Sequence, residues 1–330
     1  SDLPERRRPS STSRRRTIAA IAVGVVLLLA ISLKGLASFY TDFLWFDSLG
    51  LRSVFSTLLW VKVGLGFVFT GVFFLMMFVS LTVAERIAPR FRPGGPDEEF
   101  LERYHELVGG RQRAVRFVVS AVLALIAGAG VSSEWQSWIL FRNRVDFGVE
   151  DPQFGVDAGF YVFQLPFLSF TVNWLFMALI IVLVITAIAH YLSGGIRVQS
   201  PAPERVTPQV KAHLSVLLAL LALVKAADYW LQRYELNFST RGVVDGATYT
   251  DVNAQLPAIN LLLIISLFAC GLFIVNIWRR GWTYPVVAVG LWAFVALLIG
   301  TGYPAFIQQF QVRPDESDRE APYIAHNIEA

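Results

Sequence analysis

Five ionisable side chains lie in or beside long apolar runs of the sequence, where a charge is costly and therefore informative. They are Lys34, Lys62, Glu134, Lys225 and Asp228. An unpaired charge at the centre of a bilayer costs about 2.5–3.5 kcal/mol on insertion scales. Lys225 and Asp228 are three positions apart, so they share one face of a helix and are predicted to form a local pair. The five groups form a candidate intramembrane polar network.

Lys34 and Lys62 have no acid at helical spacing. We expect them to extend outward to Asp42, Asp47 or Glu134. The network then has two interpretations. It is a path for an ion or a proton, or it is a set of structural ion pairs below the outer loops. We favour the structural interpretation, because the pairing alone offsets the cost of the charges.

Other patterns that carry chemistry are missing from the sequence. No two of the four histidines have the i, i+4 spacing of a helical metal site, and Cys270 is the single cysteine. Asp151, Asp157, Asp245 and Asp251 could surround a hard cation, but without EF-hand spacing. There is no phosphate loop, dinucleotide motif or catalytic triad. We therefore predict no metal, no cofactor and no catalytic residue, and we favour a non-enzymatic role.

The elements that position these residues are membrane spans. Apolar residues make up 55% of the 330 residues and charged residues 16%, against about 25% in soluble domains. A span needs about 20 residues of helix. The sequence predicts an all-α, polytopic bundle of about seven transmembrane helices, which are Thr17–Phe39, Ser56–Ala84, Phe117–Leu140, Phe167–Leu192, Leu214–Leu231, Leu256–Ile277 and Thr283–Phe306.

Six spans is the alternative count. The third segment becomes polar after Val131, and the fifth is short and carries the Lys225–Asp228 pair. Within the third segment, the sequence GAG at Gly128–Gly130 favours close helix packing. Outside the spans, Asp97–Val108 is predicted to form a surface helix.

Lys and Arg residues are distributed unevenly among the connections. With the amino terminus inside, the inner tail and loops carry six, seven, three and two of them, eighteen together, and the outer side carries seven. This predicts a cytoplasmic amino terminus and an extracytoplasmic carboxyl terminus in the cell membrane. The chain then divides into a basic tail at 1–16, a transmembrane domain at 17–306, and the start of an extracytoplasmic domain at 307–330.

Three outward stretches combine acids, aromatic residues and glycine: Tyr40–Leu51, Asp151–Phe167 and Asn237–Ala258. Aromatic residues favour headgroup depth. We expect short amphipathic elements there, with Asp157 toward water, that pack together into one outer cap. The candidate cap residues are Phe43, Trp45, Asp47, Asp151, Asp157, Phe160, Tyr161, Tyr249 and Asp251.

The sequences DFLWFDSLG, DPQFGVDAGFYVFQLPF and STRGVVDGATYTDVNAQLPA together resemble uncharacterised protein family 0182. The resemblance covers essentially the whole chain. It implies a multipass membrane protein of actinobacteria and some other prokaryotes, with about seven amino-terminal helices and a large extracytoplasmic domain. It also implies that this chain is the membrane part of a longer protein. No catalytic residue or substrate follows from the resemblance.

These observations favour a membrane domain that anchors an outer domain and serves assembly, maintenance or transport of cell-envelope material. A transporter or channel that uses the Lys, Asp and Glu residues is the second hypothesis, and an intramembrane enzyme at the outer interface is the third. The expected partners are the lipid bilayer, the chain's own outer domain, and a second copy or other envelope proteins. Nucleic acid is not among them, because the basic tail lies beside a membrane helix and favours anionic lipid.

Overall fold

The structure is a computed structural model that describes residues 33–89, 110–197, 205–242 and 244–329. Over these residues the chain is helical, with turns and two isolated β-bridges but no strand, so the predicted all-α class is confirmed there. Most of the first expected span and the whole of the expected surface helix Asp97–Val108 lie outside the described residues. The chain divides into two compact units, at 1–61 and 62–330, which are treated separately below.

In the first unit, a helix covers residues 33–48 and a short turn leads to α2, Arg52–Arg86. The turn contains Gly50 at a φ of 70°, a conformation that glycine adopts without strain. The helix thus continues through Tyr40–Ser48, beyond the end expected for the first span at Phe39. The apolar run marked the end of the span but not the end of the helix.

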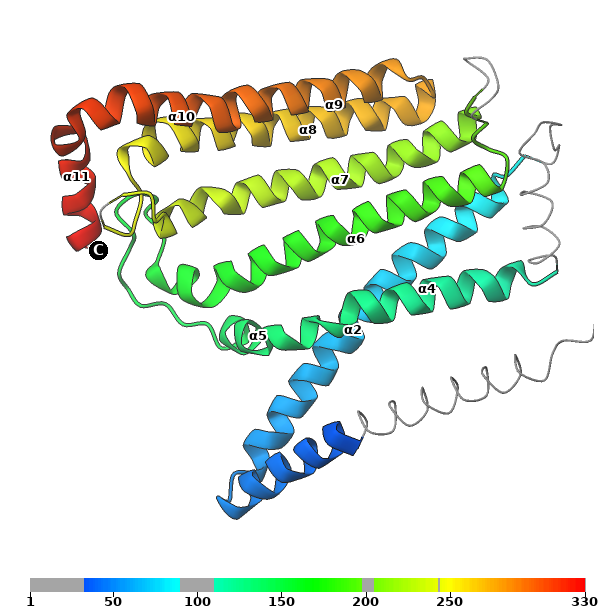
Figure 1. The fold of residues 1–330 in the computed structure, drawn as a ribbon, viewed down its shortest axis with the longest axis horizontal. Helices are drawn as coiled ribbons and strands as arrows, with labels where there is room; N and C mark the ends of the chain where they lie inside the picture. Colours follow the sequence, from blue (N-terminus) through cyan, green and yellow to red (C-terminus); the bar gives the residue numbers. More distant parts are fainter. Residues whose placement is uncertain (1–32, 90–109, 198–204, 243, 330) are drawn as a thin grey trace, which may run out of the picture. The chain divides into compact units, whose positions relative to one another are not determined.

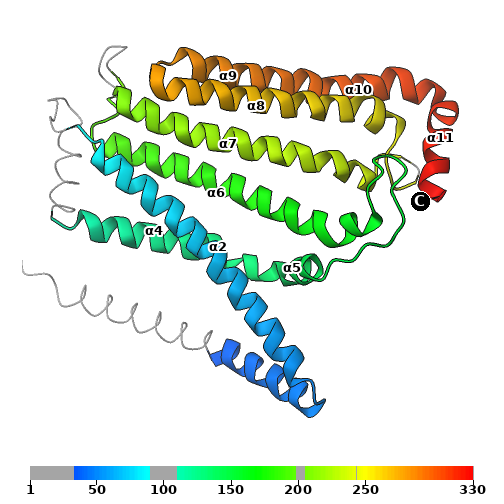
Figure 2. The same cartoon turned by 180° about the vertical axis from the view of Figure 1, so that it is seen from behind.

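The second unit contains most of α2 and eight further helices in the described residues. They are α4 Gln112–Ala129, α5 Trp135–Arg142, α6 Leu165–Leu192, α7 Pro208–Glu235, α8 Leu256–Arg279, α9 Thr283–Val295, α10 Tyr303–Ile307 and α11 Glu316–Glu329. Helices α6, α7 and α8 lie side by side, and α9 packs on the far side of α8 (Figures 1 and 2). Helix α11 turns across one end of this layer (Figure 1).

The helices are joined and extended by short non-α turns. The segment expected as one span at Phe117–Leu140 consists of α4 and α5, with a 3-10 turn at Val131–Glu134 between them. Single π turns precede α6 at Phe160–Gln164 and α8 at Asp251–Gln255. Two more follow α9 and α10, at Ala296–Gly302 and Gln308–Val312. Prolines at the first turns of α6, α7 and α8 fit positions where a backbone N–H is unpaired in any case.

The core is small and the apolar outer surface is large. Phe73, Met77, Ala124 and Val182 are almost completely buried where α2, α4 and α6 meet. In contrast, Phe67 is 78% exposed and Trp278 is 73% exposed. A soluble domain rarely exposes such continuous apolar area, so these faces fit a lipid environment. In the described residues, six helical segments are long and apolar enough to cross a membrane.

The two ends of the second unit differ in chemistry. The acidic–aromatic end consists of residues 143–164, 236–242, 244–255 and 308–329, and α11 lies across it (Figure 1). The basic end consists of Arg86 and residues 110–116, 193–197, 205–211 and 279–282. These names are used below for the two ends.

Candidate functional site

Lys225 and Asp228 form the ion pair that their spacing predicts. Lys225 Nζ lies 2.6 Å from Asp228 Oδ2, and Gln232 Nε2 donates to the same oxygen at 2.7 Å. The ammonium group also lies over the rings of Phe176 and Tyr229, at 5.4 and 4.7 Å from their centroids. Asp228 is 5% exposed. Each charge is thus neutralised inside α7, which is the arrangement that a buried pair requires.

The other members of the predicted network make separate contacts. Lys62 Nζ lies 5.4 Å from the centroid of the Trp135 ring, and Glu134 accepts a hydrogen bond from Ser137 at 3.0 Å. Asp47 pairs with Arg52 instead of a lysine, because the turn after residue 48 brings the guanidinium group back to it. Lys34 is an exposed residue of the first unit. In the described residues no ion pair joins these groups into one network.

The first of the predicted cap stretches is organised around Phe55. The ring of Phe55 contacts those of Phe39, Phe43 and Phe46 at centroid distances of 5.4, 5.6 and 5.7 Å. Trp45 packs edge-on against Phe46 at 4.9 Å. This aromatic cluster holds the turn between the helix at 33–48 and α2.

In the second stretch, Asp157 organises the loop before α6. Its carboxylate accepts hydrogen bonds from the backbone N–H groups of Phe147, Gly148 and Gly159 at 3.0, 2.8 and 2.7 Å. These bonds, first that from Phe147, lower the pKa of Asp157 below its usual value. Asp157 was expected to face water. Its carboxylate instead binds backbone N–H groups of the loop that would otherwise lack a partner.

Asp151 has a similar role next to it. Its carboxylate accepts from the Phe154 N–H at 2.6 Å and from the Tyr161 hydroxyl at 3.1 Å. The Tyr161 ring also lies 6.1 Å from that of Phe238, and Phe160 lies 5.2 Å from Tyr234. The second and third stretches therefore meet at the acidic–aromatic end.

In the third stretch, Asp251 is 1% exposed, and its carboxylate has several partners. It forms a salt bridge with Arg241 at 3.1 Å and accepts a hydrogen bond from the Thr248 hydroxyl at 2.8 Å. The Thr248 N–H donates to it as well, at 3.2 Å. Asp251 thus fixes the start of the π turn that leads into α8.

Helix α11 is fixed on this stretch by side chains. Glu320 accepts a hydrogen bond from the Tyr249 N–H at 3.0 Å, although it is only 6% exposed. Asn327 Nδ2 donates to the carbonyl of Ala247 at 3.3 Å, and Asn253 Nδ2 donates to the Tyr323 hydroxyl at 2.7 Å. The sequence analysis did not include Glu320 or Asn327, since their partners are 71 and 80 residues earlier in the chain.

Gly246 makes the approach of α11 possible. Its φ is 133°, and a Cβ at this position would lie 2.4 Å from the side-chain carbon of Asn327. Any other residue would be strained at this φ, and the Asn327 side chain would have to leave its place beside Ala247. The acidic–aromatic end therefore joins the membrane helices to the chain that follows the last of them through specific side-chain contacts.

Toward the basic end, the structure reveals a buried histidine pair. His190 Nε2 and His213 Nδ1 are 3.0 Å apart, and His213 Nε2 lies 3.4 Å from Ser80 Oγ. Ser80 in turn bonds to Thr186 at 2.6 Å. His190 is completely buried, and its Nδ1 has no hydrogen-bond partner. This chain of polar groups connects α2, α6 and α7.

The sequence analysis found no helical metal-site spacing among the histidines and did not pair His190 with His213, which are 23 residues apart. The signal that identifies them is topological. His190 lies in the last turn of α6 and His213 in the second turn of α7, so the connection between the two helices returns the chain to the same depth. Two polar residues that both lie within two turns of the connection between neighbouring helices are candidates for a contact.

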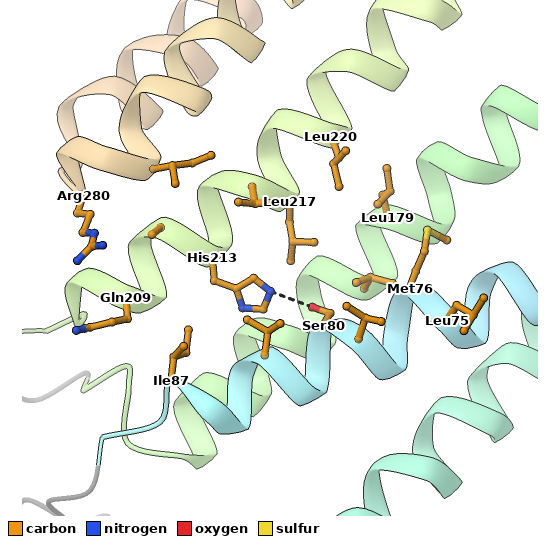
Figure 3. Close-up of a pocket in the computed structure, with 16 residues that line it drawn as sticks. Leu75, Met76, Ser80, Ile87, Leu179, Gln209, His213, Leu217, Leu220 and Arg280 are labelled. Carbon is orange, nitrogen blue, oxygen red and sulfur yellow. Dashed lines mark hydrogen bonds between the residues drawn. The ribbon is translucent and has the colours of Figure 1, made fainter.

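A groove of about 690 Å³ runs beside the histidine pair. Leu75, Met76 and Val79 of α2, Leu179 of α6 and Leu217 and Leu220 of α7 form its apolar walls. Gln209, His213 and Arg280 are its polar lining residues together with Ser80. Figure 3 shows Arg280 and Gln209 near Ile87 at one end of the groove, with Leu75, Leu179 and Leu220 toward the other.

The described residues contain no group of three His, Cys, Asp or Glu side chains that could hold a metal ion. Ligand pockets in proteins are mostly apolar with a few placed polar groups, and their volumes are about 300–1,000 Å³. The groove at the basic end has these properties. It can hold an apolar chain that carries a polar group at one end.

Comparison with known proteins gives the family. The model of the uncharacterised protein family UPF0182 matches residues 19–330. A UPF0182 protein of Nocardioides sp. is 44% identical over 323 residues, which cover 98% of this chain and 32% of the relative. A UPF0182 protein of Streptomyces coelicolor is 39% identical, with 96% of this chain and 32% of the relative covered.

No solved structure matches the chain. The chain spans about a third of the length of the curated relatives it matches. The resemblance found in the three outward stretches agrees with the family match, and the matched relatives are actinobacterial. The chain belongs to the uncharacterised protein family UPF0182.

Proposed function

We propose that this chain is the membrane domain of a longer cell-envelope protein, and that it anchors the remaining chain at its acidic–aromatic end. The contacts of α11 carry this proposal. A helix that follows the last span and is held by Glu320, Tyr323 and Asn327 cannot swing freely. A domain attached to it would keep a defined position above the bilayer.

The proposed orientation places the acidic–aromatic end outside the cell. The excess of Lys and Arg on the opposite side supports it, through the positive-inside rule. In this arrangement the bilayer and the outer domain are partners of the chain, and other envelope proteins have access to the same side. The proposed role is in assembly, maintenance or transport of envelope material.

Cysteine labelling in intact cells tests the orientation. Cys270 is first replaced by serine, and single cysteines are then introduced as Asp146→Cys at the acidic–aromatic end or Arg111→Cys at the basic end. Both positions are exposed. An impermeant thiol reagent should label position 146 in intact cells and position 111 only after lysis. The opposite pattern would exclude the proposed orientation.

The anchoring role is tested in the full-length protein. Glu320→Ala combined with Asn327→Ala removes two of the contacts that hold α11, so an added protease should cleave residues 241–246 several times faster. Asp318→Ala is the matched control, because it changes an exposed acid of the same helix. Equal cleavage of the double variant and the control would show that α11 does not hold this end together.

A further inference from the structure

The groove at the basic end is about one leaflet deep. Along α2 it extends from Ile87, the residue after the helix, to Leu75, twelve positions, which is about 18 Å at about 1.5 Å per residue. On α7 it extends from Gln209 to Leu220, which is about 16 Å. Half of a hydrocarbon core of about 30 Å is about 15 Å. The apolar walls therefore match the reach of lipid tails from one headgroup layer.

The polarity of the groove changes along this length. Arg280 and Gln209 lie at its basic end, where a headgroup would be (Figure 3). Ser80 and His213 lie deeper, at seven and four positions from Ile87 and Gln209. A phospholipid has its phosphate at the surface, its ester groups below and its tails deepest. The polar groups of the groove follow the same order.

Arg280 is held in place by a cap of α8. It has a left-handed backbone conformation with a φ of 53°, and its N–H donates to the Asn276 carbonyl at 2.7 Å. The Asn276 side chain accepts from the Gly281 N–H at 3.0 Å and donates to Ser215 of α7 at 2.8 Å. Asn276 is completely buried. These bonds fix the end of α8 against α7 and keep Arg280 at the groove.

The charge at this position favours an anionic partner. In the described part of the chain, Arg280 forms no salt bridge with a carboxylate, and it is the basic Lys or Arg side chain that lines the groove. Basic pockets between transmembrane helices are suited to lipid phosphate groups. We propose that this groove binds one anionic phospholipid of the bilayer, with its phosphate at Arg280 and Gln209 and its tails between α2 and α7.

Native mass spectrometry of the full-length protein tests the proposal. The protein is reconstituted in nanodiscs of phosphatidylcholine that contain a minor fraction of phosphatidylglycerol. The lipid that remains bound to the released protein is then identified by its mass. Phosphatidylglycerol should be retained in preference to phosphatidylcholine. Arg280→Gln should weaken this retention about fivefold, the effect of about one basic residue at a membrane surface. Arg279→Gln is the matched control, since Arg279 does not line the groove.

A second pair of variants tests the tail site. Val79→Trp fills the groove, whereas Val68→Trp places the same ring on α2 outside it, and both valines are 56% exposed. Val79→Trp should abolish retention and Val68→Trp should preserve it, with both proteins folded by circular dichroism. Equal loss in the two arginine variants, equal retention of both lipids, or retention in Val79→Trp would overturn the proposal. So would a groove occupied by a second copy of the chain.

Discussion

At the scale of single residues, two acids of the outward stretches form hydrogen bonds and an ion pair that hold the backbone around them. Asp157 accepts three backbone hydrogen bonds, and Asp251 joins an arginine and a threonine. Backbone N–H groups that lack helix or sheet partners must be satisfied in another way. In irregular stretches next to spans, carboxylates take this role. Acids in such stretches are thus predicted better by counting unpaired N–H groups than by assuming exposure.

Acid should open the loop that Asp157 holds. Because the pKa of Asp157 is lowered in the folded loop, its contribution to stability is present above the unfolded value of about 3.9 and is lost as the pH falls through the lower folded value. A spin label at Asp146→Cys, in the Cys270→Ser background, should become mobile as the pH falls through the lowered pKa of Asp157. In the Asp157→Asn variant the label should be mobile at neutral pH as well. A label that is immobile in both cases would contradict this role.

The Lys225–Asp228 pair can be tested by a double-mutant cycle. Asp228→Leu should destabilise the protein by about 3–5 kcal/mol, because it leaves a poorly solvated amine without its partner. Lys225→Met together with Asp228→Leu should cost much less. Thermal unfolding in detergent or nanodiscs gives the comparison. Additive losses would mean that the two groups do not stabilise each other.

Residue spacing also shows what a sequence can and cannot predict. The Lys225–Asp228 pair could be predicted, because three positions along one helix fix the geometry. The His190–His213 pair could not be found by spacing, since it depends on how α6 and α7 are connected. The contacts of Glu320 and Asn327 depend on the fold of the whole acidic–aromatic end. Contacts within one helix can thus be predicted from residue spacing, and contacts between helices cannot.

At the scale of elements, the apolar pattern located the spans but not their ends. Helix α7 extends over Pro208–Glu235, whereas the apolar run suggested Leu214–Leu231. The added turns contain His213 and Gln232, whose polar groups have partners inside the protein. Paired polar residues therefore extend a membrane helix beyond its apolar part. Likewise, the π turns at four helix junctions leave no mark in hydropathy.

Close packing of α2 and α4 depends on Gly128, as the GAG sequence predicts. A Cβ at Gly128 would lie 1.9 Å from Thr70 Oγ1 and 3.2 Å from the Gly66 carbonyl oxygen. Gly128→Ala should cost about 1–3 kcal/mol through overpacking. Thr70→Ala should recover part of this loss in the double variant.

Gly130→Ala is the control for this experiment. A Cβ at Gly130 meets open space, and its φ of −81° is accessible to alanine. Thermal unfolding of Gly130→Ala should be close to that of the unaltered protein. If both alanine variants unfold alike, the contact between α2 and α4 is not limited by Gly128.

At the scale of the whole molecule, the second unit has two ends with separate proposed roles. One end holds the chain that follows the last span, and the other presents a basic groove to the lipid. The layer of helices between them has a small core and broad apolar faces. A protein of this kind depends on its bilayer for stability. The acidic–aromatic end and the basic end can also be mutated separately, because no described hydrogen bond joins them.

The π turn at Gln308–Val312 has a consequence for the angular phase of the chain. A π turn contains one residue more than an α turn, so it sets the rotation of everything that follows. Because the wider turn takes up only one extra residue, insertion of an alanine after Gln309 should rotate α11 by about 100°. Hydrogen exchange should then show a faster Tyr249 amide and an unchanged α9. An outer domain attached to α11 would face a different direction, with the membrane helices themselves unaltered.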